Sequence, residues 1–141
     1  MSTNKVFHCR IKALSSIKDD INQAIKTGKK NIQKKNVAYF ATRESFRKFL
    51  SSYKLEILIN LKHNEFESVY SLASFLERDY SSVLTDINAL DASGFITLTK
   101  SKKGKRDVSS PSMAFDYDVI SFEDEDYNLS FPLVENISIV A

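Results

Sequence analysis

The stretch that decides the fold is residues 68–106, SVYSLASFLERDYSSVLTDINALDASGFITLTKSKKGKR. Ser68 is a favourable helix N-cap, because its side-chain oxygen can accept a hydrogen bond from an unpaired backbone N–H of the first turn. Apolar residues then recur at the spacing of one helix face, at Val69, Leu72, Ala73 and Leu76. After the polar residues 77–79 a second set follows, at Tyr80, Val83, Leu84, Ile87 and Leu90. The pattern predicts two helices joined by a tight turn.

A strand and a basic turn follow the two helices. Gly94 stands where a helix C-terminus needs a left-handed residue, and residues 96–100 alternate like a half-buried strand. Cations then crowd around Gly104, the expected tip of a β-hairpin, at Lys100, Lys102, Lys103, Lys105 and Arg106. We expect a long turn through residues 102–111 and a return strand over residues 113–122, paired with residues 96–100.

This order of elements predicts a winged helix-turn-helix. In that fold one helix enters the DNA major groove, and the hairpin, or wing, lies along the phosphate backbone. The predicted recognition helix spans about residues 80–93, and its polar face carries Ser81, Ser82, Thr85 and Asn88. Hydroxyls and amides can bond base edges and phosphates, although an ordinary solvated helix surface has the same composition.

Four residues near the predicted turn have separate roles. Arg78 could reach a phosphate or a guanine edge. Tyr80 is either a core residue, which we favour, or a phosphate contact. Asp79 is suited to be the N-cap of the second helix, and Asp86 to pair with a nearby cation. The basic residues of the wing, Lys100, Lys102, Lys103, Lys105 and Arg106, are expected on phosphates; a solvated loop is the alternative.

The rest of the chain predicts further strands and helices. Residues 5–12 alternate like a strand, and a helix over residues 14–25 is stopped by Gly28. Residues 37–40 look extended, and helices are expected to begin at Thr42 and at Ser51 or Ser52. Beyond an acidic break at residues 123–126, Leu129, Phe131 and Leu133 alternate and predict a last strand.

The fold class is therefore α+β, a winged helix-turn-helix domain with an N-terminal strand–helix extension and C-terminal strands. We place the extension at residues 1–41, for dimerisation or partner binding. The winged domain takes residues 42–122, and an acidic and apolar tail takes residues 123–141.

Charge is distributed unevenly along the chain. Residues 1–106 hold all 20 Lys and Arg and 10 acids, a net charge of +10, whereas residues 107–141 hold 8 acids and no Lys or Arg. Such asymmetry favours a body that binds a polyanion, with an acidic end. The alternative is that the two ends neutralise each other in the fold.

Several classes of function find no support in the sequence. No run of 18 apolar residues predicts a membrane span, and because the first residues show no apolar run before a small-residue cleavage site, we expect no signal peptide. Cys9 is the only cysteine, which fits a reducing, cytoplasmic setting. His8 and His63 have no ligand-like spacing, and no phosphate-binding glycine motif or nucleophile elbow occurs. We expect no catalytic residue, metal site or cofactor, and no enzymatic activity.

Residues 78–90, RDYSSVLTDINAL, resemble the R-D-Y-x-x-V-x-x-D-[VI]-x-x-L stretch of a family of predicted MarR-like winged-helix regulators of bacteria and archaea. Residues 46–50 and 54–58 resemble that family's lead-in to its first winged-domain helix. The resemblance implies a transcriptional regulator that binds double-stranded DNA, usually as a homodimer. The family often has charged or amide residues where this chain has Ser81 or Ser82, and basic residues at Thr85 or Asn88, so the phosphate grip shifts to the wing.

Some members of that family look like antitoxins encoded beside a small toxin. By that resemblance the protein would bind a toxin and repress its own operon. The alternative function is a protein-interaction module that neutralises a partner enzyme without significant DNA binding. Its candidate surfaces are the N-terminal extension and the acidic residues 116–135, which could fit a basic cleft by charge complementarity.

Overall fold

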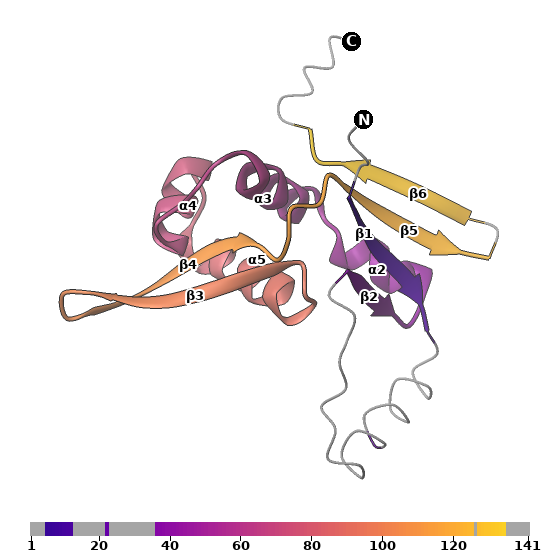
Figure 1. The fold of residues 1–141 in the computed structure, drawn as a ribbon, viewed down its shortest axis with the longest axis horizontal. Helices are drawn as coiled ribbons and strands as arrows, with labels where there is room; N and C mark the ends of the chain where they lie inside the picture. Colours follow the sequence, from indigo (N-terminus) through magenta and orange to yellow (C-terminus); the bar gives the residue numbers. More distant parts are fainter. Residues whose placement is uncertain (1–4, 13–21, 23–35, 126, 135–141) are drawn as a thin grey trace.

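Helices and strands combine in a mixed α+β fold with two separate sheets (Figure 1). The structure is a computed structural model that describes residues 5–12, 22, 36–125 and 127–134. The helix expected over residues 14–25 and its stop at Gly28 lie outside these residues, apart from Asn22. No helix in the described ranges is long and apolar enough to cross a membrane. The elements run in the order β1 (Val6–Ile11), β2 (Val37–Phe40), α2 (Arg43–Phe49), α3 (Ser52–His63), α4 (Val69–Leu76), α5 (Tyr80–Ala92), β3 (Ile96–Lys103), β4 (Arg106–Met113), β5 (Val119–Asp124) and β6 (Tyr127–Pro132).

Side-chain caps fix where the helices begin. The Thr42 hydroxyl accepts from the backbone N–H of Ser45 at the start of α2, and Ser51 does the same for Lys54 at the start of α3. Ser68 caps α4 in a reciprocal pair with Ser71, and the carboxylate of Asp79 accepts from Ser82 N–H at the start of α5. Each cap satisfies a donor that the first helical turn leaves unpaired. The predicted starts of these helices are confirmed, with Ser51 rather than Ser52 capping α3.

The larger sheet has the strand order β2-β1-β5-β6. Its central strand β1 runs parallel to both β2 and β5, whereas β6 closes antiparallel on β5. The side chains of Phe7, Cys9, Ile120 and Phe122 are fully buried. Phe46 of α2 stacks on Phe122 with ring centroids 4.3 Å apart, so α2 covers the buried face of this sheet.

The return strand was predicted wrongly. The strand that pairs with β3 is β4, from Arg106 to Met113, whereas Val119–Asp124 form β5 and pair with β1 in the other sheet. The hairpin turn is confined to Gly104 and Lys105, so the turn is not a long loop through Pro111. Pro111 is tolerated inside β4 because residue pairs alternate between bonded and non-bonded along an antiparallel ladder. Counting from the closing pair Lys103–Arg106, the Leu98–Pro111 pair is non-bonded.

The acidic break is also shorter than predicted, because Glu123 and Asp124 belong to β5 and only Glu125 stands in the described part of the turn. The last strand is confirmed as β6. Strands of the larger sheet thus come from both ends of the chain.

The helices and the larger sheet share one hydrophobic core. Helices α3, α4 and α5 bury Ile57, Leu72 and Ile87 among others. At the junction, Phe95 follows α5 and stacks on Phe7 of β1, with ring centroids 4.2 Å apart. The hydroxyl of the buried Tyr117 donates to the carbonyl of Phe95 over 2.7 Å. This contact ties the segment between β4 and β5 to the end of α5, so the helical layer is held against the sheet.

Candidate nucleic-acid interface

Helix α5 has one buried and one exposed face. Val83, Ile87 and Leu90 are fully buried, and this places the polar face in solvent. Its members, all exposed, are Ser81, Ser82, Thr85 and Asn88. Two of them are engaged locally: Ser81 donates to the Asp79 carboxylate, and the Thr85 hydroxyl donates to the Ser81 carbonyl over 2.9 Å. The amide of Asn88 has no partner within the described part of the chain, so it is the group most available to a ligand.

The N-cap of α5 is a charged one. The hydroxyl of Ser81 and the backbone N–H of Ser82 donate to the Asp79 carboxylate, and these bonds hold the pKa of Asp79 below its ordinary value. An ionised carboxylate at this position also interacts favourably with the helix dipole. The expected cap role of Asp79 is confirmed, and it places a negative charge beside the first turn of α5.

Arg78 is engaged inside the protein. Its Nη2 donates to Oδ2 of Asp86 over 2.9 Å, and its guanidinium carbon lies 4.5 Å from the ring centroid of Tyr53 on α3. The side chains of Arg78 and Asp86 are only 17% and 18% exposed. The predicted partner of Asp86 is therefore Arg78, and the guanidinium expected at a phosphate or guanine is held against the helices instead.

Tyr80 is not the core residue that we favoured. Its side chain is 44% exposed and lies beside the more exposed Tyr70 of α4, with ring centroids 6.1 Å apart. Tyr80 is the first residue of α5, and its ring lies beside the second residue of α4 rather than in the core. The two rings form an exposed aromatic pair near the start of both helices, a pair that apolar periodicity could not distinguish from core.

The hairpin of β3 and β4 carries a concentration of positive charge that we call the basic hairpin, defined by Lys100, Lys102, Lys103, Lys105 and Arg106. It projects beyond the helices in Figure 1. Lys100, Lys102, Lys105 and Arg106 are exposed, and none of them makes an ion pair among the described residues. Asp107, opposite Lys102, is the only acid in either strand.

Register places two of these lysines on one face. In β3, Lys100 and Lys102 share a face with Ile96 and Leu98, because alternate residues of a strand point to the same side. Ile96 is buried and Leu98 half-buried in the core, so this face of the hairpin is the one turned toward the helices.

Gly104 adopts a φ of +68° at the tip of the hairpin, where a residue with a Cβ would be strained. Lys103 ends β3 opposite Arg106.

Acidic residues of the C-terminal part neutralise cations elsewhere in the molecule. Glu123 pairs with His8 at 2.8 Å and with Arg10 at 3.0 Å, and Asp124 pairs with Arg43 at 3.0 Å. Burial alone would raise the pKa of Glu123, but the hydrogen bonds from His8 and Arg10 outweigh it and lower the pKa. The two ends of the chain therefore do pair, yet Lys100, Lys102, Lys105 and Arg106 of the basic hairpin keep no ion pair among the described residues.

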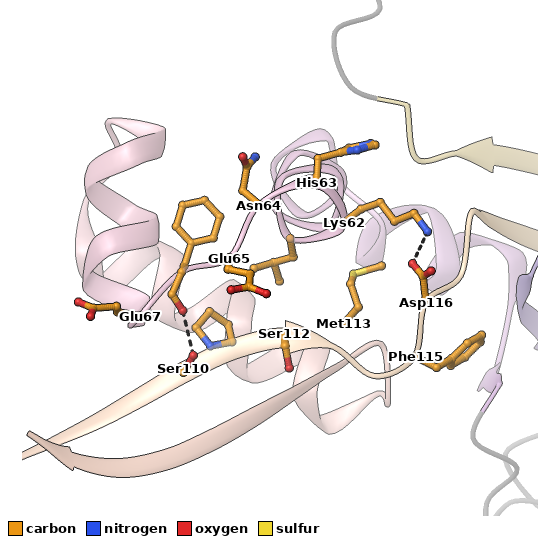
Figure 2. Close-up of a pocket in the computed structure, with 13 residues that line it drawn as sticks. Lys62, His63, Asn64, Glu65, Glu67, Ser110, Ser112, Met113, Phe115 and Asp116 are labelled. Carbon is orange, nitrogen blue, oxygen red and sulfur yellow. Dashed lines mark hydrogen bonds and ion pairs between the residues drawn. The ribbon is translucent and has the colours of Figure 1, made fainter.

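A groove of about 830 Å³ lies between the end of α3 with its following loop and the second half of β4 (Figure 2). The hydroxyl of Ser110 bridges it by donating to the carbonyl of Phe66 over 2.9 Å. The one lysine in its lining, Lys62, is already paired with Asp116 and Asp118. None of the predicted DNA-contacting residues lines this groove, and sequence periodicity carried no sign of it. Within the described ranges, no three His, Cys, Asp or Glu side chains are grouped to hold a metal ion.

The architecture defines an α+β protein with an exposed polar helix beside a basic hairpin. The family model described as HVO_A0114 matches residues 49–122, just over half of the chain, so the protein belongs to the HVO_A0114 family. The matched residues run from the end of α2 into β5 and include α3, α4, α5 and the basic hairpin. No curated protein matches the chain, and no solved structure matches it either. The resemblance to MarR-like regulators stays a prediction.

Proposed function

We propose that this protein is a sequence-specific DNA-binding transcriptional regulator with a winged helix-turn-helix domain. Helix α5 is the recognition helix, and its polar face enters the major groove. The basic hairpin is the wing and contacts phosphates. The observation that carries the proposal is the pairing of an exposed hydroxyl and amide face with a projecting hairpin whose described cations have no internal partner.

The connection between α4 and α5 supports a helix-turn-helix. Helix α4 ends at Glu77, which takes a left-handed conformation with a φ of +55°. The backbone N–H of Arg78 then bonds the Ala73 carbonyl over 3.0 Å, and Asp79 begins α5 at once. A turn this short fixes the angle between the two helices, which lets one helix support the other against a duplex.

Charge in the interface supports a division of labour. The polar face of α5 has no lysine or arginine, and Asp79 places a negative charge at its start. The basic hairpin therefore provides the phosphate contacts, whereas the hydroxyls and the Asn88 amide of α5 recognise the bases. If a homodimer neutralises about six phosphates, the log–log dependence of affinity on salt has a slope of roughly −5.

Selection from a pool of random-sequence duplexes tests the proposal. We expect the full-length protein to enrich one sequence motif, and Asn88→Ala to lower affinity for the enriched duplex by about tenfold, within the range of one lost base contact. Ser74→Ala on the exposed surface of α4 is the matched control and should bind like the unaltered protein. A selection that enriches no motif would contradict sequence-specific binding.

The toxin-binding alternative gains no specific support. Four acids of the C-terminal part, Asp116, Asp118, Glu123 and Asp124, already pair with cations of the same chain. Less negative charge is thus available to a basic toxin cleft than composition suggests. The homodimer belongs to the proposal through the family resemblance, and light scattering of the purified protein tests it.

A further inference from the structure

Arg78 connects three parts of the helical layer. It stands in the turn between α4 and α5, its guanidinium covers the ring of Tyr53 on α3, and its Nη2 bonds Asp86 in the second turn of α5. Nη1 is buried and has no hydrogen-bond partner among the described residues. Burying a guanidinium nitrogen without a hydrogen-bond partner costs free energy of folding. The other contacts of Arg78 must outweigh this cost, so the position of its side chain is important to the fold.

We propose that Arg78 is a positioning residue: it sets the rotation of α5 against α3 and thereby the sequence discrimination of the interface, without touching DNA itself. The part of this inference that concerns DNA rests on the proposed function. Its geometric part, that Arg78 clamps α5 through Asp86 and α3 through Tyr53, stands on the contacts alone.

The location of Asp86 explains why such a clamp would control recognition. Asp86 lies between Thr85 and Asn88, two members of the polar face, but points to the side of the helix where Arg78 is held. A rotation of α5 about its axis would therefore move Thr85 and Asn88 along the base edges. Hydrogen bonds weaken steeply with misalignment, so a small rotation lowers discrimination before it lowers phosphate attraction.

Only arginine makes both contacts of the clamp. A planar guanidinium can lie on an aromatic ring and donate in its own plane to a carboxylate, whereas the compact ammonium of lysine cannot combine the two. The Tyr53 hydroxyl has no partner in the described residues, so the ring is the contributing part of Tyr53. Arg78→Lys should therefore release the clamp, and Tyr53→Phe should keep it.

The experiment compares Arg78→Lys, Asp86→Asn and Tyr53→Phe in the full-length protein. The probes are the duplex enriched by the unaltered protein and an unrelated duplex of equal length, each titrated at several salt concentrations. For Arg78→Lys and Asp86→Asn we expect the ratio of the two affinities to fall by about tenfold, comparable to the loss of one base contact. The salt slope should not become less negative, and the affinity for the unrelated duplex should not decrease. Tyr53→Phe should match the unaltered protein.

Asp86→Asn best distinguishes loss of the clamp from a simple effect of charge on DNA binding. Removing a negative charge beside DNA would by itself strengthen binding to every duplex, whereas loss of the clamp weakens binding to the selected duplex alone. Arg78→Ala, titrated in the same way, tests for a direct contact: a salt slope less negative by about 0.9 would show that Arg78 binds a phosphate and would overturn the proposal. An unchanged affinity ratio in both Arg78→Lys and Asp86→Asn would overturn it as well.

Backbone amide exchange separates this inference from the proposed function. In Asp86→Asn the amides of α5 should exchange faster, while those of α2 and of the paired strands β1 and β5 keep their protection. If the protein selects no duplex, the proposed function fails, and faster exchange confined to α5 would still support the clamp. Exchange that is unchanged in α5 would remove the clamp whatever the protein binds.

Discussion

Cations of the basic hairpin should contribute to DNA affinity far more than cations of the larger sheet. The test pair is Lys102→Ala with Lys105→Ala, two exposed lysines without an ion pair among the described residues. The control pair is Arg10→Ala with Arg43→Ala, whose guanidinium groups bond Glu123 and Asp124 at 3.0 Å. Both double variants remove two positive charges, so a response to net charge alone would be equal in the two.

The expected magnitude follows from counterion release. Each phosphate contact contributes about −0.9 to the slope of log affinity against log salt. Two lost contacts make the slope less negative by up to about 1.8 per protomer. Over a fourfold rise in salt this reduces the loss of affinity by about tenfold. The control pair should leave the slope unchanged, because its arginines are already neutralised by carboxylates.

Fluorescence anisotropy of a labelled duplex, titrated with protein at four salt concentrations, measures these slopes. Equal slopes for the hairpin variant and the unaltered protein would refute the assignment of the hairpin as the wing. Equal changes in the hairpin and control variants would refute the argument from local neutralisation, because they would show that net charge alone governs binding.

Three further predictions concern stability and reactivity. Glu77 adopts a left-handed backbone conformation, so Glu77→Gly should stabilise the protein by about 0.5–1 kcal/mol in urea unfolding. Gly94 is also left-handed, so Gly94→Ala should destabilise the protein by a similar amount, although the added Cβ would meet no atom within 4 Å. The hydrogen bond from Lys62 lowers the folded-state pKa of Asp118 below its unfolded value, so its stabilisation is present above that unfolded pKa and is lost as pH falls through the folded pKa. The urea concentration at the unfolding midpoint should therefore decrease as the pH is lowered from about 5 to about 3, and this decrease should be smaller in Asp118→Asn. Burial, helped by the charge of a nearby carboxylate, raises the pKa of the Cys9 thiol to about 12, so Cys9 should react with a thiol reagent at about pH 8 only after unfolding.

Local signals were sufficient for the helices from α2 to α5 and for the turn between α4 and α5. The caps at Thr42, Ser68 and Asp79 act within three residues, and the left-handed φ of Gly94 ends α5 as predicted. Alternation likewise predicted β1 and β6, and residues 37–40, expected to be extended, form β2. Such features depend on interactions between near neighbours in sequence, so a single sequence contains them.

Pairings over long sequence separation were decided by the tertiary structure. Residues 119–124 can satisfy a strand pattern in either sheet; in the folded chain they pair with β1, and Phe122 packs on Phe46 of α2. The sequence also does not show where a charged side chain points. Arg78 was predicted to contact DNA, but its guanidinium lies on Tyr53 and bonds Asp86. By itself the sequence determined where the described helices begin and where cations concentrate, because those depend on local contacts. Which strands pair, and which charges are left free, depended on neighbours that only the folded chain brings together.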